Sequence, residues 1–289
     1  MDGTFSKCPK VYNDGRHNNG QLLTIAARIR GFTLPLFYCL MKQRTSAAYV
    51  EVFQAILQRV NLAPLSFMTD LELAMSRAIS EIFPNCEHTL CYYHFQESLY
   101  SWICSNGLKT RYLNDVRARK FLHKFGCLAF LPIEKVLDGW RLLNEELLEF
   151  EEDDDIESFV NYFSGSFIGR MGENNRRMRP RHDPIKWNQY QRTMNLEPRT
   201  NNALEGWHNS LNHLNYADHP NMFRLLKIIK EDMHRTRVYF VQNNPRPKKR
   251  TYRDLDVSIK NLCQMLGENP SDQMITNFLS AASNLYNFY

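Results

Sequence analysis

The first part of the chain alternates between strand-like and helix-like patterns of apolar residues. Apolar runs bounded by Gly, Pro and Asn predict strands, and apolar positions three or four residues apart predict helices. In order, they predict a strand at 2–5, a hairpin of strands at 21–30 and 32–41 joined at Gly31, a helix at 45–60, a strand at 65–69, a helix at 71–83 and a strand at 88–93. This is the layout of a mixed α/β sheet covered by helices. Pro35 cannot donate to a strand ladder, so we expect its strand to lie at the sheet edge or to carry a bulge.

The pattern changes at Phe95, after which strand-like runs are absent from the sequence as far as residue 195. Helical spacing predicts helices at 96–105, 108–125, 133–150 and 156–167, then from Asn202, at 220–240, and as two short helices in the tail 255–289. The chain therefore divides into a mixed part at 1–94, an all-helical part at 95–195, a helical part at 196–241 and a C-terminal part at 242–289.

The stretch from Arg199 to His208 sets one acidic residue, Glu205, among amide, basic and aromatic side chains. On a helix from Asn202, one apolar stripe is formed by Leu204, Trp207, Leu211 and Leu214. Glu205, His208 and Asn212 share the adjacent face. Glu205 could serve a site at the edge of that stripe. Asn202-x-x-Glu205 also fits a capping box, in which Glu205 folds back on the helix start. The stretch alone leaves both interpretations open.

The composition is typical of a globular protein that is able to bury a full core. The 289 residues carry 36 Lys+Arg against 31 Asp+Glu, a formal charge of +5 that permits a nucleic-acid partner without requiring one. No apolar run approaches the roughly 20 residues that cross a bilayer, so we expect no membrane association and an intracellular protein. The seven cysteines are odd in number and widely spread, which favours reduced thiols.

Three acidic residues stand out by position: Asp2 on the first strand, Asp70 at the end of the strand 65–69, and Glu205. Carboxylates at the ends of neighbouring strands converge, and a helix packed on the sheet can bring a third. Mg²⁺ prefers such oxygen ligands, and two ions could activate an attacking oxygen and stabilise a leaving one in phosphodiester transfer. Glu72 competes with Asp70, but two residues along a helix it should point elsewhere.

Three charged stretches have weaker interpretations. The acidic run 145–157 is best explained as a solvated helix end. The basic, Gly/Asn-rich segment 170–181 is typical of an exposed loop able to meet phosphates. The basic, Pro-containing segment 243–250 fits a nuclear-import or phosphate-contact patch, or a plain linker.

Six separated blocks resemble, in order, the Mutator-like element (MULE) transposase domain over about residues 1–235. They are Asp2-Gly3-Thr4-Phe5 with Cys8-Pro9-Lys10, Met68-Thr69-Asp70 with Ala74, Cys91-x-x-His94-Phe95, Ala129-Phe130-Leu131-Pro132, Trp187-Asn188, and Arg199-Thr200-Asn201-Asn202-x-x-Glu205-Gly206-Trp207-His208. The resemblance implies an α/β fold with a ribonuclease H-like mixed sheet, interrupted by an all-helical insertion at 95–195 and completed at 196–241. It implies that Asp2, Asp70 and Glu205 form a DDE triad that binds Mg²⁺ or Mn²⁺.

Two further sets of residues are candidates for binding. Cys86-x-His88-x-x-Cys91-x-x-His94 has zinc-like spacing, although strand alternation would send some of the four to opposite faces, and only Cys91 and His94 are part of the family motif. Zn²⁺ binding and simple packing both remain open. Near Glu205, a DNA strand could be held by Arg199, Asn201, Asn202 and His208. The alternative is local: surface charge, helix caps and, for Trp207, the core.

Two functions from different classes follow. The first is a nuclear DNA transposase core that cuts and joins strands at transposon ends and self-associates to bring two ends together. The second is a truncated or domesticated derivative that binds nucleic acid or a partner without catalysis. The presence of all three acidic residues favours the enzyme. Two features favour the derivative. Only Met1 precedes Asp2, so half of the strand that carries the first acid is missing from this sequence, and so is the zinc-finger domain that the family usually has.

Overall fold

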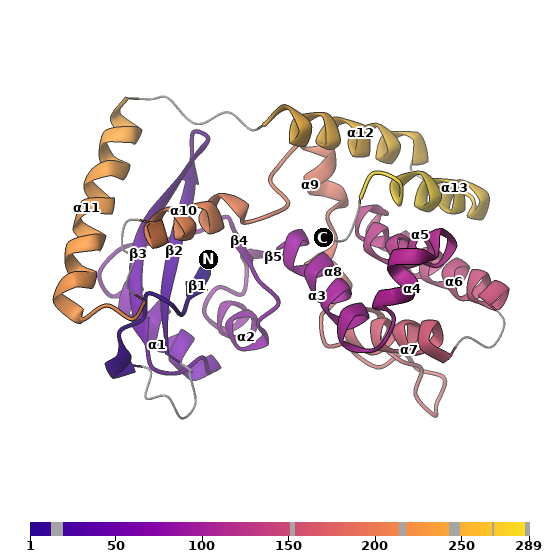
Figure 1. Ribbon diagram of the computed structural model, residues 1–289, viewed down its shortest axis with the longest axis horizontal. Coiled ribbons are helices and arrows are strands. Elements are labelled where there is room, and N and C mark those ends of the chain that lie inside the picture. The colour runs from indigo at the N-terminus through magenta and orange to yellow at the C-terminus, as the bar shows by residue number, and fades with distance from the viewer. Residues whose placement is uncertain (13–19, 151–153, 214–217, 243–248, 268, 287–289) are drawn as a thin grey trace. The chain divides into compact units, whose positions relative to one another are not determined.

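The computed structural model describes residues 1–12, 20–150, 154–213, 218–242, 249–267 and 269–286, with the backbone alone at 205 and 209–213. The chain divides into two compact units, each made of two segments. Unit 1 is Met1–His88 with Thr200–Lys248, and unit 2 is Thr89–Arg199 with Lys249–Tyr289 (Figure 1). No helix within the described ranges is long and apolar enough to cross a membrane. All seven cysteines are free thiols.

Unit 1 is built on short β-sheets, which confirms the α/β class. Strands β1 (Asp2–Thr4), β2 (Gln21–Ile29) and β3 (Phe32–Met41) form an antiparallel sheet in the order β1-β2-β3. Strand β4 (Ser66–Thr69) pairs with β5 (Glu87–Leu90). The β2–β3 turn consists of Arg30 and Gly31 at φ 50° and 84°, the positive angles that a tight hairpin of twisted strands needs.

Alternation along β2 sends its side chains to two apolar layers. On one face, Leu23 and Ile25 pack with α1 (Ser46–Leu57) and α2 (Leu73–Ile82). On the other face, Leu22 packs with Leu225 and Ile228 of α11 (Met222–Val241) and with Trp207 of α10 (Asn202–His213). The sheet is therefore covered by helices on both sides, as the apolar pattern predicted.

Both predictions for Pro35 are confirmed. It lies in β3, which has β2 as its single partner among the described strands, and the register shifts between Ile25 and Ala26, where Ala26 stands opposite Pro35. A bulge at that point removes the ladder bond that proline could not make.

Unit 2 is helical, with aromatic rings filling its core. Its helices are α3 (Tyr92–Ser105), α4 (Lys109–Asn114), α5 (Val116–Cys127), α6 (Val136–Leu147), α7 (Asp154–Phe163), α8 (Pro184–Trp187), α9 (Tyr190–Met194), α12 (Arg250–Leu266) and α13 (Asp272–Ala282). A π-helical segment, η5 (Ser164–Ile168), continues α7, and short 3₁₀ turns lie at Leu128–Phe130, Ile133–Lys135 and Leu148–Phe150. Unit 1 has one such turn at Lys10–Tyr12.

Some elements differ from the prediction in their boundaries or their packing. The expected helix 108–125 is two helices, because Asp115 ends α4 and its carboxylate caps α5 by accepting the N–H groups of Arg117 and Ala118. Strand β5 ends at Leu90, and Tyr92 is already helical. The C-terminal helices pack into unit 2, with α12 against α9 and α13 against α5 and α6, although their sequence is separated from the rest of that unit.

The charged stretches are explained only in part. Within the acidic run, Glu149 pairs with Arg117 at 2.8 Å on the surface, as expected for a solvated helix end, whereas Glu146 accepts from the buried Lys124 at 2.6 Å. Residues 151–153 of that run, and 243–248 of the basic segment 243–250, lie outside the described residues.

Candidate active site

The predicted acids Asp2 and Asp70 come from neighbouring strands. The Met1 amino group donates to the Met68 carbonyl at 2.7 Å, which places the start of β1 against β4. Asp2 is the first residue of β1, and Asp70 directly follows β4. The two strands therefore bring the two acids to the same part of unit 1.

The Asp2 carboxylate is held by contacts on both of its oxygens. Oδ1 accepts the N–H of Gly3 at 2.9 Å, and Oδ2 lies 3.1 Å from His208 Nδ1 on α10. His208 Nε2 lies 3.4 Å from the hydroxyl of Thr24, the residue opposite Asp2 in the β1–β2 register. Because a carboxylate only accepts, Nδ1 carries the hydrogen, and in a neutral ring Nε2 accepts from Thr24. The result is a buried chain of bonds from β2 through α10 to Asp2.

Asp70 has a second carboxylate nearby. Its Oδ1 accepts the N–H of Glu72 at 3.2 Å. Burial raises the pKa of the Glu72 carboxyl and the charge of Asp70 raises it further, while a hydrogen bond from Tyr49 and the charge of Arg44 oppose the shift. The Tyr49 hydroxyl also lies 2.6 Å from Gln21 Nε2, which donates to it. The prediction that Glu72 points elsewhere is wrong, because α2 begins at Leu73 and Glu72 has the extended backbone of a helix cap.

Helix α10 carries Glu205 on the same element as His208. The helix begins at Asn202, as predicted, and the Leu204 N–H bonds to the Asn201 carbonyl at 2.7 Å. Glu205 is then the fourth helical residue, one position beyond the third, which a capping-box glutamate would occupy. It stands three residues before His208, so the two positions share one face of the helix. The Glu205 side chain lies outside the described side chains.

A polar contact ties α10 to the sheet and to α11. The Trp207 indole N–H donates to Asp232 Oδ2 at 2.8 Å, and the Tyr38 hydroxyl donates to the same oxygen at 2.9 Å. Burial and the Asp232 charge raise the pKa of Tyr38 well above its ordinary value. Trp207 packs against the apolar layer of β2, β3 and α11, as predicted for a core residue. This contact sets the position of α10 and with it that of His208 and Glu205.

The four residues predicted to hold DNA, Arg199, Asn201, Asn202 and His208, differ in exposure and in their contacts. Arg199 belongs to unit 2, is 9% exposed, donates to Asp256 at 2.6 Å and lies over the Phe130 ring. A guanidinium bound in this way is not available to a phosphate, so Arg199 leaves the set. His208 is buried and positions Asp2. Asn201 is also buried, and Asn202 is exposed at the start of α10.

The four residues with zinc-like spacing are divided between the two units. In unit 1, the Cys86 thiol donates to the Pro64 carbonyl at 3.3 Å and His88 Nε2 lies 2.9 Å from the Thr69 hydroxyl. In unit 2, Cys91 is buried just before α3 and the ring of His94 contacts that of Tyr93. Among the described side chains, no group of three or more His, Cys, Asp or Glu residues is arranged to hold a metal ion. Zinc binding stays a prediction.

Three supporting residues were missed from the sequence: Thr24, Tyr49 and Asp232. A signal existed for two of them. Thr24 is a polar residue within the apolar run of β2, and Asp232 interrupts the apolar face of α11. Tyr49 fits the apolar face of α1, so the sequence offered no reason to give its hydroxyl a polar partner.

The comparisons with known proteins cover the first three of the six blocks. The family model described as the MULE transposase domain matches residues 2–98, a range that contains Asp2, Asp70, Cys91 and His94, whereas Glu205 and His208 lie beyond it. Comparisons with curated proteins and with solved structures gave no match. The family model thus supports the resemblance over residues 2–98, which are similar to the MULE transposase domain.

Proposed function

We propose that this chain is the catalytic core of a DNA transposase that cuts and joins DNA strands at transposon ends. The domain match supports a transposase-related function and, in general terms, DNA as the partner. Asp2, Asp70 and Glu205 are the proposed ligands of Mg²⁺ or Mn²⁺. Nuclear localisation and self-association, which brings two DNA ends together, are parts of the same proposal.

One observation carries the proposal. His208 on α10 lies 3.1 Å from Asp2 on β1, so the helix that bears Glu205 packs against the strand that bears the first acid. Since Glu205 and His208 share a helix face, the third acid belongs to the same side of the sheet. Three acids far apart in sequence thereby come from adjoining elements.

The strand order supports a ribonuclease H-like core. The described strands form two sheets, β1-β2-β3 and β4-β5, and the Met1 amino group of the first bonds to the Met68 carbonyl of the second. Read across that bond, the proposed order in unit 1 is β3-β2-β1-β4-β5. In this order, β1 and β4 are central neighbours, and the two aspartates lie where these strands meet. The edge position of β3 agrees with Pro35 in that strand.

The donor set fits a hard divalent cation. Asp2 and Asp70 offer carboxylate oxygens, and the Asp70 charge already opposes ionisation of its neighbour Glu72. A cation there would relieve that repulsion. Mg²⁺, when bound by Asp2, Asp70 and Glu205, supplies charge stabilisation for phosphodiester cleavage and strand transfer. His208 and Gly3 hold the Asp2 carboxylate in one orientation, and Tyr49 holds Glu72 by a hydrogen bond, which favours a supporting role for Glu72.

Plasmid nicking in the presence of Mg²⁺ or Mn²⁺ tests this function. We expect the wild-type chain to nick supercoiled DNA and Asp70→Asn and Glu205→Gln each to lower the rate by at least about 10²-fold, since each substitution removes a charged metal ligand. Mn²⁺ affinity, measured by calorimetry, should fall in parallel.

The matched control is Glu81→Gln, which removes one exposed carboxylate from α2 in the same unit and should leave both readouts unchanged. Nicking that survives Glu205→Gln would reject the triad. A folded chain that binds neither Mn²⁺ nor DNA, and nicks nothing, would support the derivative without catalysis instead.

A further inference from the structure

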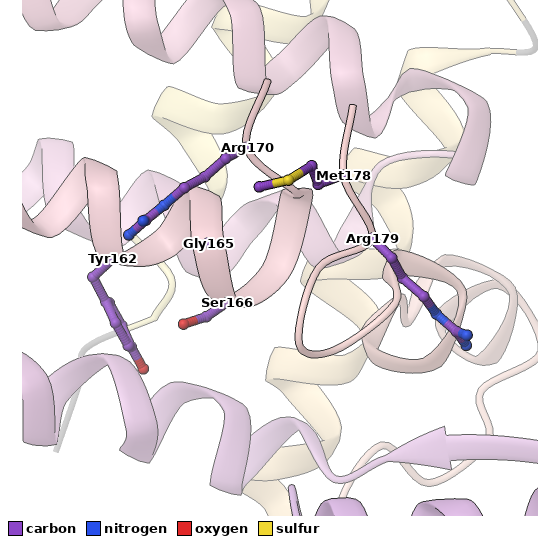
Figure 2. Close-up of a pocket in the computed structure, with 6 residues that line it drawn as sticks. All are labelled: Tyr162, Gly165, Ser166, Arg170, Met178 and Arg179. Atoms are coloured by element: carbon purple, nitrogen blue, oxygen red, sulfur yellow. The ribbon is translucent and has the colours of Figure 1, made fainter. Parts of the chain in front are cut away.

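Unit 2 contains a pocket of about 320 Å³ beside its π-helical segment. Figure 2 shows the residues that line it, which come from the end of α7, from η5 and from the basic loop that follows: Tyr162, Gly165, Ser166, Arg170, Met178 and Arg179. The volume lies at the lower end of the roughly 300–1,000 Å³ range of ligand sites. π-helical turns recur at functional sites, and this one lies outside the residues matched by the transposase domain.

The basic loop is anchored by its backbone. The N–H of Met178 donates to the Arg170 carbonyl at 2.8 Å, and Met171 and Arg177 form an antiparallel bridge. Further along, the N–H groups of Arg181 and His182 donate to the carbonyls of Gly165 and Ser166 in η5. The loop therefore holds its arginines in set positions, which lowers the entropy lost when they bind a ligand.

Gly165 makes room for the guanidinium of Arg170. A Cβ at position 165 would lie 3.0 Å from Arg170 Nε and 3.2 Å from Nη2. Arg170 thus lies along the backbone of η5, at the wall of the pocket (Figure 2). Because the crowded atoms are the far end of a flexible side chain, Gly165→Ala should move the guanidinium without unfolding the helix.

Positive charge predominates here, because the segment 170–181 holds five arginines and one acidic residue, Glu173. Among the described residues, no carboxylate forms an ion pair with any of the exposed arginines Arg170, Arg176, Arg179 and Arg181. Burial lowers the pKa of Lys186, and the charge of Arg179 lowers it further. The pKa of the buried His182 falls to about 4, mainly by burial and also through the charges of Arg181 and Lys186. This part of unit 2 is suited to an anion.

The pocket also offers hydroxyl groups. Tyr162 and Ser166 both line the pocket and carry hydroxyls, and the Tyr162 ring stacks on Trp102 at 5.2 Å. Hydroxyls and guanidiniums together are the groups that bind phosphate oxygens, with arginine able to bind two oxygens at once.

We propose that this pocket binds a phosphate of the DNA backbone, so that the helical unit holds DNA in addition to the carboxylate site of unit 1. The choice of DNA as the source of the phosphate rests on the proposed function. Arg170 contacts the phosphate oxygens, and Tyr162 and Ser166 supply hydroxyls. Arg179, whose guanidinium points away from these three residues (Figure 2), adds long-range attraction together with Arg176 and Arg181. Contacts of this kind are independent of base sequence.

Fluorescence anisotropy of a DNA duplex with the full chain in EDTA tests the inference, because binding is then read without cleavage. The variants are Arg170→Gln/Arg179→Gln, Gly165→Ala, and the control Arg253→Gln, which removes an exposed arginine of α12 from the same unit. We expect the double variant to bind about tenfold or more weakly at low salt, and to reduce the slope of log K against log salt by about 1–2 between about 50 and 200 mM. Gly165→Ala should give a smaller loss, and Arg253→Gln none.

Calorimetry with sodium phosphate distinguishes DNA from free phosphate. Loss of phosphate binding in the double variant, with DNA affinity and salt slope unchanged, would overturn the inference in favour of a free-anion site. A wild-type chain that binds no DNA, or equal losses in the double variant and Arg253→Gln, would also overturn it. The nicking assay tests the catalytic proposal separately. If the double variant still nicks DNA and binds it with unchanged affinity, only the inference about the pocket is rejected. If DNA binding depends on the pocket but the chain does not nick, only the catalytic proposal is rejected.

Discussion

The two units bury different kinds of groups, and the difference decides where their functional residues lie. Unit 1 has thin apolar layers on both faces of its sheet, in which aliphatic side chains mix with rings such as Phe53 and Phe67. Polar contacts cross these layers, such as Trp207 with Asp232 and His208 with Asp2. Unit 2 has a core of stacked rings, among them Phe95 on Trp187, and carries a cluster of exposed arginines on the loop 170–181. Substitutions should therefore disturb geometry first in unit 1 and stability first in unit 2.

Trp187→Ala should produce the largest loss of stability. Trp187 is fully buried, stacks on Phe95 at 5.2 Å and 5°, and its indole N–H donates to the carbonyls of Phe167 and His182. Truncating such a ring costs about 3–5 kcal/mol of unfolding free energy. Urea unfolding with hydrogen exchange resolved by unit measures this. Trp102→Ala, at a partly buried ring, should cost less than half as much, and equal losses would contradict the contrast between core and surface.

Acid should weaken unit 2 through two buried histidines. The pKa of His123, which bonds to Tyr112 at 2.7 Å and to the Ser283 carbonyl, falls to about 4 because of burial, and the pKa of His182 also falls to about 4. Protonation then favours the unfolded chain. The stabilisation is complete above the ordinary pKa of 6.5 and is lost as pH falls from 6.5 towards 4, at up to about 1.4 kcal/mol per pH unit for each histidine.

Unfolding free energy measured across that range checks the pH dependence. His123→Gln should flatten the slope, because a neutral amide replaces a group that gains a proton on unfolding. The exposed His234 of unit 1 is the control, and His234→Gln should leave the slope as it was. A slope that His123→Gln does not change would assign the acid sensitivity to other groups.

Local patterns predicted the elements of both units but not their long-range partners. The hairpin at Gly31 and the bulge at Pro35 depend on neighbouring residues and were predicted. Asp115 was missed as a boundary because a short acidic residue fits both an exposed helix position and a cap. The union of α12 with unit 2 was not predicted, since the bond from Arg199 to Asp256 joins residues with no common local pattern.

The candidate site shows the same limit. The sequence predicted Asp2 on the first strand and Asp70 just after the strand at 65–69, and the structure has them there, because strand patterns are local. The partner of Asp2 was not predicted: His208 was expected to meet DNA, and its buried contact with Asp2 spans most of the chain. Periodicity predicts which face of a helix is buried, but it does not predict which polar atom lies opposite.

His208→Ala should weaken metal binding rather than the fold. The substitution removes the donor on Asp2 Oδ2, and losing a partner that orients a ligand typically costs about 10–100-fold in metal affinity. Mn²⁺ titration followed by electron paramagnetic resonance measures it. His208→Asn keeps an N–H close to the position of Nδ1 and should restore most of the affinity, while His234→Gln should have no effect. Equal affinity in His208→Ala and wild type would separate His208 from the metal site.

Helix caps should give the smallest effects, and similar ones in the two units, because capping is local and does not depend on what the core is made of. Thr45 accepts the N–H of Ala48 at 3.2 Å in unit 1, and Asp115 accepts two N–H groups, at 2.8 and 3.1 Å, in unit 2. Replacing either by Ala should cost about 1 kcal/mol, with the larger loss at Asp115. Thr45→Ser and Asp115→Asn, which keep an acceptor, should cost less. Because Tyr49 stays buried in α1, Thr45→Ala should lower stability without changing Mn²⁺ affinity, whereas a fall in both would show that the carboxylate site depends on the end of α1 as well as on the sheet.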